Sequence, residues 1–260
     1  MIFKTYLSYK MLCEQCFLSL KPLNKRRKEF FISVLWLFLS IKGKINFLQL
    51  ERYGKLGEQS CRQQFDKEFE FLQFNSALVS TYCSQRTVIG FDPSYIPKSG
   101  KKTAGAGFYW SGCAGAAKWG LEFCGIAAID IENHTAMHLE AVQTLPEEGE
   151  NLLDFYANVL VNRKDELQKT SKIVVADAYF SKERFISKLC VADFQVISLF
   201  RDDTRLRYLI EPVKTGKRGR PKTLGEKVDV KNLNLNYFSE IESKNPNEKI
   251  YSAVIYLCNT

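Results

Sequence analysis

The sequence predicts an α/β protein, in which a helical N-terminal module precedes a mixed sheet with helices on its faces. Two observations lead to this prediction. Up to about residue 80 the apolar residues recur at helical spacings, whereas from residue 87 onward short apolar strands alternate with amphipathic helices. The hydrophobic share of 45% over 260 residues is enough to build a sizeable core, and it argues against a disordered chain.

The N-terminal module, residues 1–82, is predicted to consist of short helices. Its apolar segments are separated from one another by proline or glycine, and they cover residues 12–20, 29–41 and 46–53. A longer helix should follow, with Ser60 as its N-cap. Two roles are compatible with the module, a helix-turn-helix reader of DNA and a structural cap on the next domain, because no recognition helix stands out.

The most apolar helix, residues 30–41, is expected to be buried in protein rather than in a lipid bilayer. Only Ser33 and Ser40 are polar within it. Spanning a bilayer takes about twenty apolar residues, and this run has twelve. The eight cysteines are scattered along the chain, which is typical of reduced thiols. We therefore expect a cytoplasmic protein without a membrane partner.

The region 83–212 is predicted to be an RNase H-like core. Its expected elements are strands 87–92, 121–131 and 135–144, helix 151–169, strand 171–177, helix 182–191 and strand 194–200. Three successive strands predict an antiparallel meander, and the later alternation adds parallel strands through right-handed crossovers. RNase H-like nucleases and integrases have this layout, although other α/β folds satisfy it too. Residues 213–260 are expected to form a basic loop and part of a β-rich insertion.

Two of the predicted strands end in a carboxylate, Asp92 after VIGF and Asp177 after IVVA. An ionised carboxylate beside apolar strand residues is costly unless it is paired or binds a cation. Two such acids from separate strands are typical of sites where Mg²⁺ or Mn²⁺ assists phosphodiester cleavage. The other interpretation is that each aspartate starts a turn, for which Asp92 followed by Pro93 is well suited.

Basic residues follow the first acid and recur in a second stretch. The chain has 37 Lys and Arg against 29 Asp and Glu, so its net charge of +8 favours polyanionic partners. The candidate phosphate contacts are Lys98, Lys101, Lys102, Lys217, Arg218, Arg220 and Lys222. Arg218 to Pro221 has the pattern of an AT-hook, which lies in A·T-rich minor groove. Both basic stretches are also compatible with solvated loops.

Two further groups of residues are expected to be structural. Trp110 and Trp119 could stack on nucleobases, but packing within the sheet is the favoured interpretation. His134 and His138 open a strand without an acid or thiol partner nearby, which argues against a metal pair.

Several long motifs, in the same order along the chain, resemble bacterial insertion-sequence transposases of the DDE type. They are SYIPKSGKKTAGAGFYWSGCAGAAKWGLEFCGIAAIDI, VVADAYFS and KRGRPKTLGEKV, and the similarity extends back through residues 42–65. The resemblance implies an RNase H-like catalytic domain that binds Mg²⁺ or Mn²⁺ through two Asp and one Glu. Asp92 matches the first acid and Asp177 matches the second.

The resemblance also implies the reaction and its partners. Metal-activated water would cut double-stranded DNA at the element's ends, and the freed 3′-OH would attack the partner or target strand. The protein would act as a homo-oligomer in the bacterial cytoplasm, associated with the nucleoid, with the N-terminal module helping to bind the DNA ends.

This chain departs from the family pattern at the third acid. In the family that Glu lies on a helix beyond the β-rich insertion, and no matching context is found up to residue 260. We therefore expect a C-terminally truncated transposase that is inactive or nearly so by itself. Two other functions are compatible with the sequence: a non-catalytic DNA-binding protein that inhibits full-length transposase, and a structure-specific nuclease.

Overall fold

A computed structural model describes residues 2–100, 102–201, 203–212, 219, 221–243 and 245–258 of the chain. The chain forms two compact units. The first comprises Met1–Gly90, Gly125–Val142 and Asp165–Ser171; the second comprises Phe91–Cys124, Gln143–Lys164 and Lys172–Thr260. The secondary structure is mixed α/β, as the sequence predicts. Among the described residues, no helix combines the length and the apolar character needed to cross a membrane.

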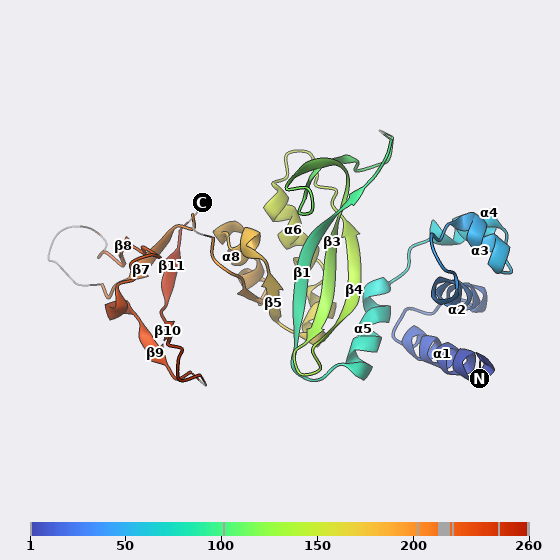
Figure 1. The fold of residues 1–260 in the computed structure, drawn as a ribbon, viewed down its shortest axis with the longest axis horizontal. Coiled ribbons are helices and arrows are strands. Elements are labelled where there is room, and N and C mark those ends of the chain that lie inside the picture. Colours follow the sequence, from blue (N-terminus) through green and yellow to red (C-terminus); the bar gives the residue numbers. More distant parts are fainter. Residues whose placement is uncertain are drawn as a thin grey trace. The chain divides into compact units, whose positions relative to one another are not determined.

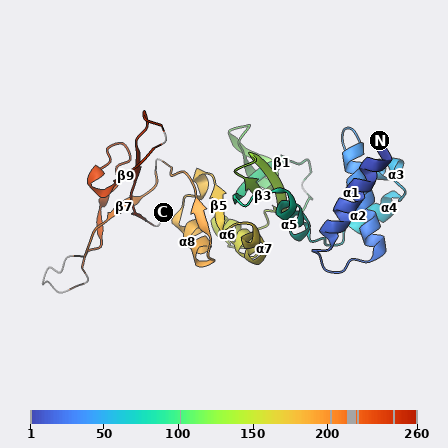
Figure 2. The same ribbon diagram turned by 90° about the horizontal axis from the view of Figure 1, so that it is seen from below.

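The N-terminal region is helical, as expected (Figure 1). Its helices are α1 (Ile2–Phe17), α2 (Lys25–Ser40), α3 (Phe47–Tyr53), α4 (Glu58–Phe65) and α5 (Phe71–Tyr82). Helices α1 and α2 lie side by side in both Figure 1 and Figure 2. Their shared core is rich in phenylalanine, and it contains Cys13 and Cys16 as buried free thiols. The only CxxC motif therefore packs within this core.

The longer helix expected from Ser60 onward was a wrong prediction, because two helices occupy this region and Gly57 is the N-cap of the first. The break is held by the buried Arg27, whose guanidinium donates to the main-chain carbonyls of Gln64, Lys67 and Glu68. The bond to Lys67 O measures 2.8 Å. Carbonyls at the end of α4 and in the segment after it thereby share one charged donor.

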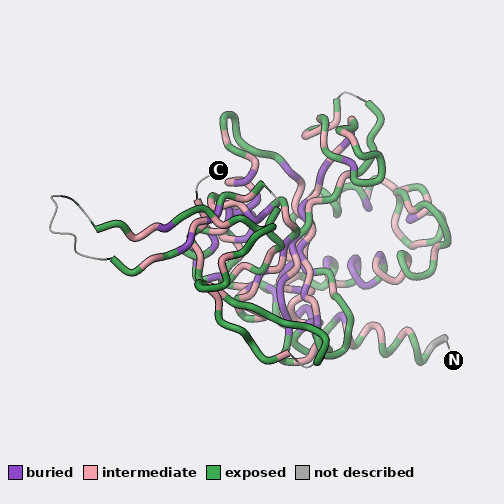
Figure 3. Tube along the Cα trace, turned by 60° about the vertical axis from the view of Figure 1, so that its left-hand side comes forward, coloured by how far each residue is buried: buried purple, intermediate pink, exposed green. Residues whose placement is uncertain are grey.

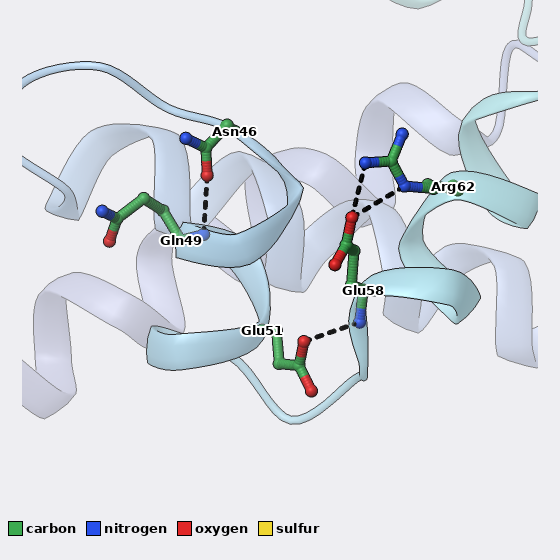
Figure 4. A network of polar contacts seen from close by, with 5 residues as sticks. All are labelled: Asn46, Gln49, Glu51, Glu58 and Arg62. Atoms are coloured by element: carbon green, nitrogen blue, oxygen red, sulfur yellow. Dashed lines mark hydrogen bonds and ion pairs between the residues drawn. The ribbon is translucent and has the colours of Figure 1, made fainter.

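Side-chain caps define the neighbouring helix ends (Figure 4). The Asn46 side chain accepts a 2.9 Å hydrogen bond from Gln49 N at the start of α3. The main-chain N–H of Glu58, in the first turn of α4, donates to Glu51 Oε2 at 3.2 Å. One turn later Arg62 Nε donates to Glu58 Oε1 at 2.9 Å. The bonds from Gln49 N and Glu58 N satisfy main-chain N–H groups that a helix cannot pair internally.

The central sheet has six strands in the order β2-β3-β1-β5-β6, with β4 also paired to β3. Its strands are β1 (Thr87–Pro97), β2 (Gly107–Ser111), β3 (Ala116–Asp130), β4 (Thr135–Gln143), β5 (Ile173–Ala176) and β6 (Gln195–Ile197). The sheet is mixed, because β2 and β3 are antiparallel whereas β5 and β6 are parallel. Strand β3 lies between β1 and β4, as a meander requires. Figure 3 marks the buried residues along these strands.

The connecting helices depart from the prediction in one place. The expected helix 151–169 is two helices, α6 (Leu152–Val161) and α7 (Lys164–Thr170), while α8 (Glu183–Val191) covers the second expected helix. Helices α6 and α8 pack together, and Asp154 of α6 pairs with Arg184 and Lys188 of α8. Strand β2 was not expected, because its glycine- and alanine-rich surroundings gave no strand pattern.

The C-terminal region is built from short strands. They are β7 (Leu206–Leu209), β8 (Leu224–Lys227), β9 (Ser239–Ile241), β10 (Ile250–Ser252) and β11 (Ile255–Leu257). A three-stranded sheet has the order β11-β7-β8, and β9 pairs with β10. The buried Tyr208 stacks on Tyr237 with ring centroids 4.2 Å apart. Since β7 begins before residue 213, this β-rich region starts earlier than the predicted domain boundary.

We predict that Arg27→Met destabilises the N-terminal helices by about 2–4 kcal/mol, because it removes a buried guanidinium that donates to three main-chain carbonyls. Urea unfolding followed by Trp36 fluorescence, with Trp110 and Trp119 replaced by Phe throughout, measures the effect; Trp36 packs against Tyr6 and Tyr9.

Arg62→Met is the matched control for this experiment. The Arg62 side chain is 56% exposed and pairs with Glu58 one turn away, so its loss should cost about 0.5 kcal/mol. An equal loss of unfolding free energy in Arg27→Met and Arg62→Met would contradict the role assigned to Arg27.

Candidate functional site

The first candidate acid, Asp92, lies in the middle of β1 and not at its end, so that prediction was wrong. Pro93 does not start a turn here but continues the strand, since the residue before a proline favours the extended backbone. Beyond Pro93 the strand runs close to β3 at Gly120, where an added Cβ would lie 2.4 Å from Ile96 O. Asp92 itself is exposed, and the preceding Phe91 is buried.

The second candidate acid, Asp177, directly follows β5, as the sequence predicted. It caps a 3₁₀ helix, η1 (Ala178–Phe180), by accepting a 3.0 Å hydrogen bond from Tyr179 N. Its main-chain carbonyl accepts a 2.7 Å bond from Ser198 Oγ, just after β6. Local hydrogen bonds from both sides thus fix the backbone that carries this exposed carboxylate.

Aromatic packing brings the two acids' backbones together. Phe91, which precedes Asp92, has its ring 5.3 Å from that of Phe180, three residues after Asp177. Tyr156 of α6 and Phe185 of α8 contact both rings, at centroid distances of 4.8 to 6.1 Å. We call Phe91, Tyr156, Phe180 and Phe185 the aromatic cluster. Because β1 and β5 are neighbours in the sheet, this cluster and the ladder together position both carboxylates.

The electrostatics indicate that the acids lie near one another. The pKa of Asp92 is raised, first by its partial removal from water and then by the negative charges of Asp177 and Glu122. Burial raises the pKa of Tyr179, and the negative charges of Glu122 and Asp177 raise it further. A cation placed near Asp92 and Asp177 would offset this repulsion.

Glu122 is an acid of this site that the sequence reasoning missed. It lies on β3 with 7% of its surface exposed. Its Oε1 accepts hydrogen bonds from Tyr156 OH at 2.5 Å and from Thr144 Oγ1 at 2.9 Å. The carboxylate therefore links the sheet to a ring of the aromatic cluster, and it contributes negative charge near Asp92.

Strand periodicity was the signal that could have identified Glu122. Alternate residues of β3 are buried from Gly120 to Asp130, and this face also carries Cys124 and Ile126. A charged residue in such an apolar series requires partners, so it is a candidate for a structural or functional role.

The structure describes only some of the predicted DNA contacts. Lys101, Lys217, Arg218 and Arg220 lie outside the described residues, and with them both arginines of the AT-hook-like motif. Lys98, Lys102 and Lys222 are described, and all are exposed. Solvated loops and phosphate contacts both remain compatible with these positions.

The donors that could bind a metal are incomplete. Among the described residues, no three His, Cys, Asp or Glu side chains gather as metal ligands. Asp92 and Asp177 supply the hard oxygen atoms that Mg²⁺ and Mn²⁺ prefer. Glu122 does not complete the set, because Tyr156 and Thr144 already bond its Oε1.

The prediction that Trp110 packs within the sheet was wrong. Its side chain lies on β2 and is 65% exposed, and the neighbouring Phe108 is 72% exposed. Strand β2 pairs only with β3, so its outer edge carries no further strand in the described structure. Trp119 is half-buried, and its Nε1 donates to Gly100 O at 3.3 Å.

Comparisons with known proteins do not identify the chain. The sequence matches no protein-family model, and a search of curated proteins also finds no match.

We predict that Asp177→Asn lowers the pKa of Asp92 toward its usual value, because the substitution removes a neighbouring negative charge and keeps the cap acceptor. NMR titration of the Asp92 carboxyl measures the change. Asp165→Asn, which alters an exposed acid on α7, is the control and should leave this pKa unchanged.

The same shift gives the pH dependence of stability. Because the folded pKa of Asp92 is raised, the unfolded chain ionises first, and this group's contribution to stability falls as pH rises from about 3.9 through the folded value. Asp177→Asn should therefore stabilise the metal-free protein near neutral pH by less than about 1 kcal/mol, since exposed charges are screened. If Asp177→Asn still increased the stability at about pH 3, where Asp92 is protonated, this interpretation would be contradicted.

Proposed function

We propose that this chain is a DDE-type DNA transposase and that residues 1–260 have little activity by themselves. Its reaction class would be metal-dependent cleavage and strand transfer at the ends of an insertion sequence. The observation that carries the proposal is the juxtaposition of Asp92 and Asp177, from neighbouring strands of one sheet, with charges close enough to interact. The sequence resemblance assigns these same two positions to the first two acids.

The strand order supports an RNase H-like core. Strand β1 lies in the interior of the sheet, with the meander strands β3 and β4 on one side and β5 and β6 on the other. Strands β5 and β6 are parallel, and α8 connects them, as a crossover requires. Strand β2 is an addition to the predicted layout, and it extends the sheet beside one end of β3.

The residues of this chain would act mainly by binding and orientation. Asp92 and Asp177 would hold Mg²⁺ or Mn²⁺, and the aromatic cluster would fix the backbones that carry them. A bound divalent cation would supply the Lewis acid for phosphodiester cleavage. Lys98 and Lys102, exposed beyond β1, would hold DNA phosphates, together with Lys222 on the second basic stretch.

The proposed low activity is supported by the small set of ligands among the described residues. Two carboxylates leave a divalent cation with few protein ligands, and Glu122 is engaged by Tyr156 and Thr144. The described residues supply no third ligand. This favours a second candidate function, in which the chain binds element ends as a homo-oligomer or mixed oligomer and inhibits an active transposase. The proposed place of action is the bacterial nucleoid.

We predict that the protein binds Mn²⁺ weakly and that Asp92→Asn and Asp177→Asn each lower the affinity at least about tenfold, because each removes one of only two carboxylate ligands. Electron paramagnetic resonance of free Mn²⁺ measures binding without any assay of activity. Asp165→Asn should bind as the unmodified protein does. Retention of full affinity by both site variants would refute the metal site.

We expect only slow nicking of supercoiled DNA in Mn²⁺, and we expect that Asp92→Asn or Asp177→Asn abolishes it. Gel analysis of nicked circles measures the rate, with Asp165→Asn as the control. DNA binding that survives these substitutions, without any nicking by the unmodified chain, would favour the inhibitor. Cleavage of branched DNA regardless of sequence would favour a structure-specific nuclease instead.

A further inference from the structure

The hairpin formed by β2 and β3 presents aromatic side chains to solvent. In its register Phe108 is opposite Trp119, and Trp110 is opposite Ala117. Because alternate residues of a strand share a face, Phe108, Trp110 and Trp119 lie on one face of the hairpin. The rings of Phe108 and Trp119 meet edge to face at 5.5 Å. We call these three residues the aromatic face.

Such exposure is unusual for residues of this size. Phe108 and Trp110 are 72% and 65% exposed, although aromatic side chains normally dominate cores and interfaces. The strand that carries them lies at an edge of the described sheet, where exposed apolar residues favour aggregation unless they serve a partner. The half-buried Trp119 packs edge to face against Phe108. The aromatic face is therefore an exposed surface carried by a paired strand.

Lysines adjoin this aromatic face. The Trp119 indole donates to Gly100 O, which lies two residues after Lys98 and two before Lys102. Within the described part of the chain, no carboxylate forms an ion pair with Lys98 or Lys102. Their charges therefore remain available to an anionic partner.

We propose that the aromatic face binds an unpaired segment of DNA, with Phe108 and Trp110 stacking on its bases and the adjoining lysines contacting its phosphates. The positive charges of the adjoining lysines favour a polyanion as the partner. The exposed rings of Phe108 and Trp110 favour a polyanion whose bases are free to stack. Bases within a duplex are already stacked on one another, whereas each base of a single strand offers a free π-face. The choice of DNA rests on the proposed function; the binding itself requires neither the acids nor a metal.

The test measures binding of a fluorescent thymidine oligonucleotide, about twelve nucleotides long, to the full chain in EDTA. Phe108→Ala and Trp110→Ala should each weaken binding by about tenfold. The slope of log affinity against log salt should stay unchanged, because these side chains release no counterions. Lys98→Ala and Lys102→Ala should instead each reduce the slope by about 0.7.

Matched variants separate stacking from bulk and from misfolding. Trp110→Phe keeps an aromatic ring and should retain most of the affinity, whereas Trp110→Leu keeps apolar bulk and should behave as Trp110→Ala does. Tyr82→Ala removes an aromatic side chain that is 57% exposed on α5, and it should have no effect. In the unmodified protein, oligonucleotide binding should quench tryptophan fluorescence, and Trp110→Phe should remove most of that quenching.

Several outcomes would overturn the proposal. One is a loss of oligonucleotide affinity in Tyr82→Ala as large as that in Trp110→Ala, and another is unchanged affinity in both Phe108→Ala and Trp110→Ala. Tighter binding to RNA or to duplex DNA would also contradict it. So would inorganic polyphosphate that competes as strongly as the unlabelled oligonucleotide does. Loss of a concentration-dependent dimer in Trp110→Ala would identify a second copy of the chain as the occupant. Binding is measured in EDTA, so failure of the metal-dependent function leaves this test interpretable.

Discussion

Apolar packing between β1 and the segment after β5 is the interaction on which the candidate site depends. Burial of one phenylalanine ring contributes about 1.5–3 kcal/mol. Two exposed like charges in water repel by about 1 kcal/mol at a separation of about 4 Å, and by less when they are farther apart. The packing of Phe91 against Phe180, with Tyr156 and Phe185 around them, is therefore strong enough to hold Asp92 and Asp177 together without a cation. Folding prepares the charged site in advance, and the cation need not organise it.

The carboxylates near this cluster have different functions because their surroundings differ. Glu122 is buried and its Oε1 accepts hydrogen bonds from two hydroxyl groups, so it serves the fold and adds a fixed negative charge. Asp177 is exposed, yet its backbone is anchored by Ser198 and its own side chain caps η1. Asp92 is exposed and carries the raised pKa. One acid of the site is thus buried and hydrogen-bonded, whereas the other two are exposed to solvent.

Sequence periodicity predicted the sheet and the position of Asp177, because the apolar run IVVA ends where β5 ends. It failed where distant residues decide local structure. Arg27 holds the break between α4 and α5 through main-chain carbonyls about forty residues away, and no pattern near that break reveals it. Asp92 was placed at a strand end because Pro93 is a turn residue in isolation, whereas packing of β1 on β3 at Gly120 keeps the chain extended.

The bonds made by Arg27 have a consequence for how this protein can change. Its guanidinium recognises the peptide carbonyls of Lys67 and Glu68, which every amino acid possesses. The side chains at these two positions are exposed and are not needed for that recognition. Substitutions there can remodel the surface between α4 and α5 while the connection keeps its shape. In the N-terminal helices, the backbone between α4 and α5 is therefore held in place while the exposed side chains on it can be substituted.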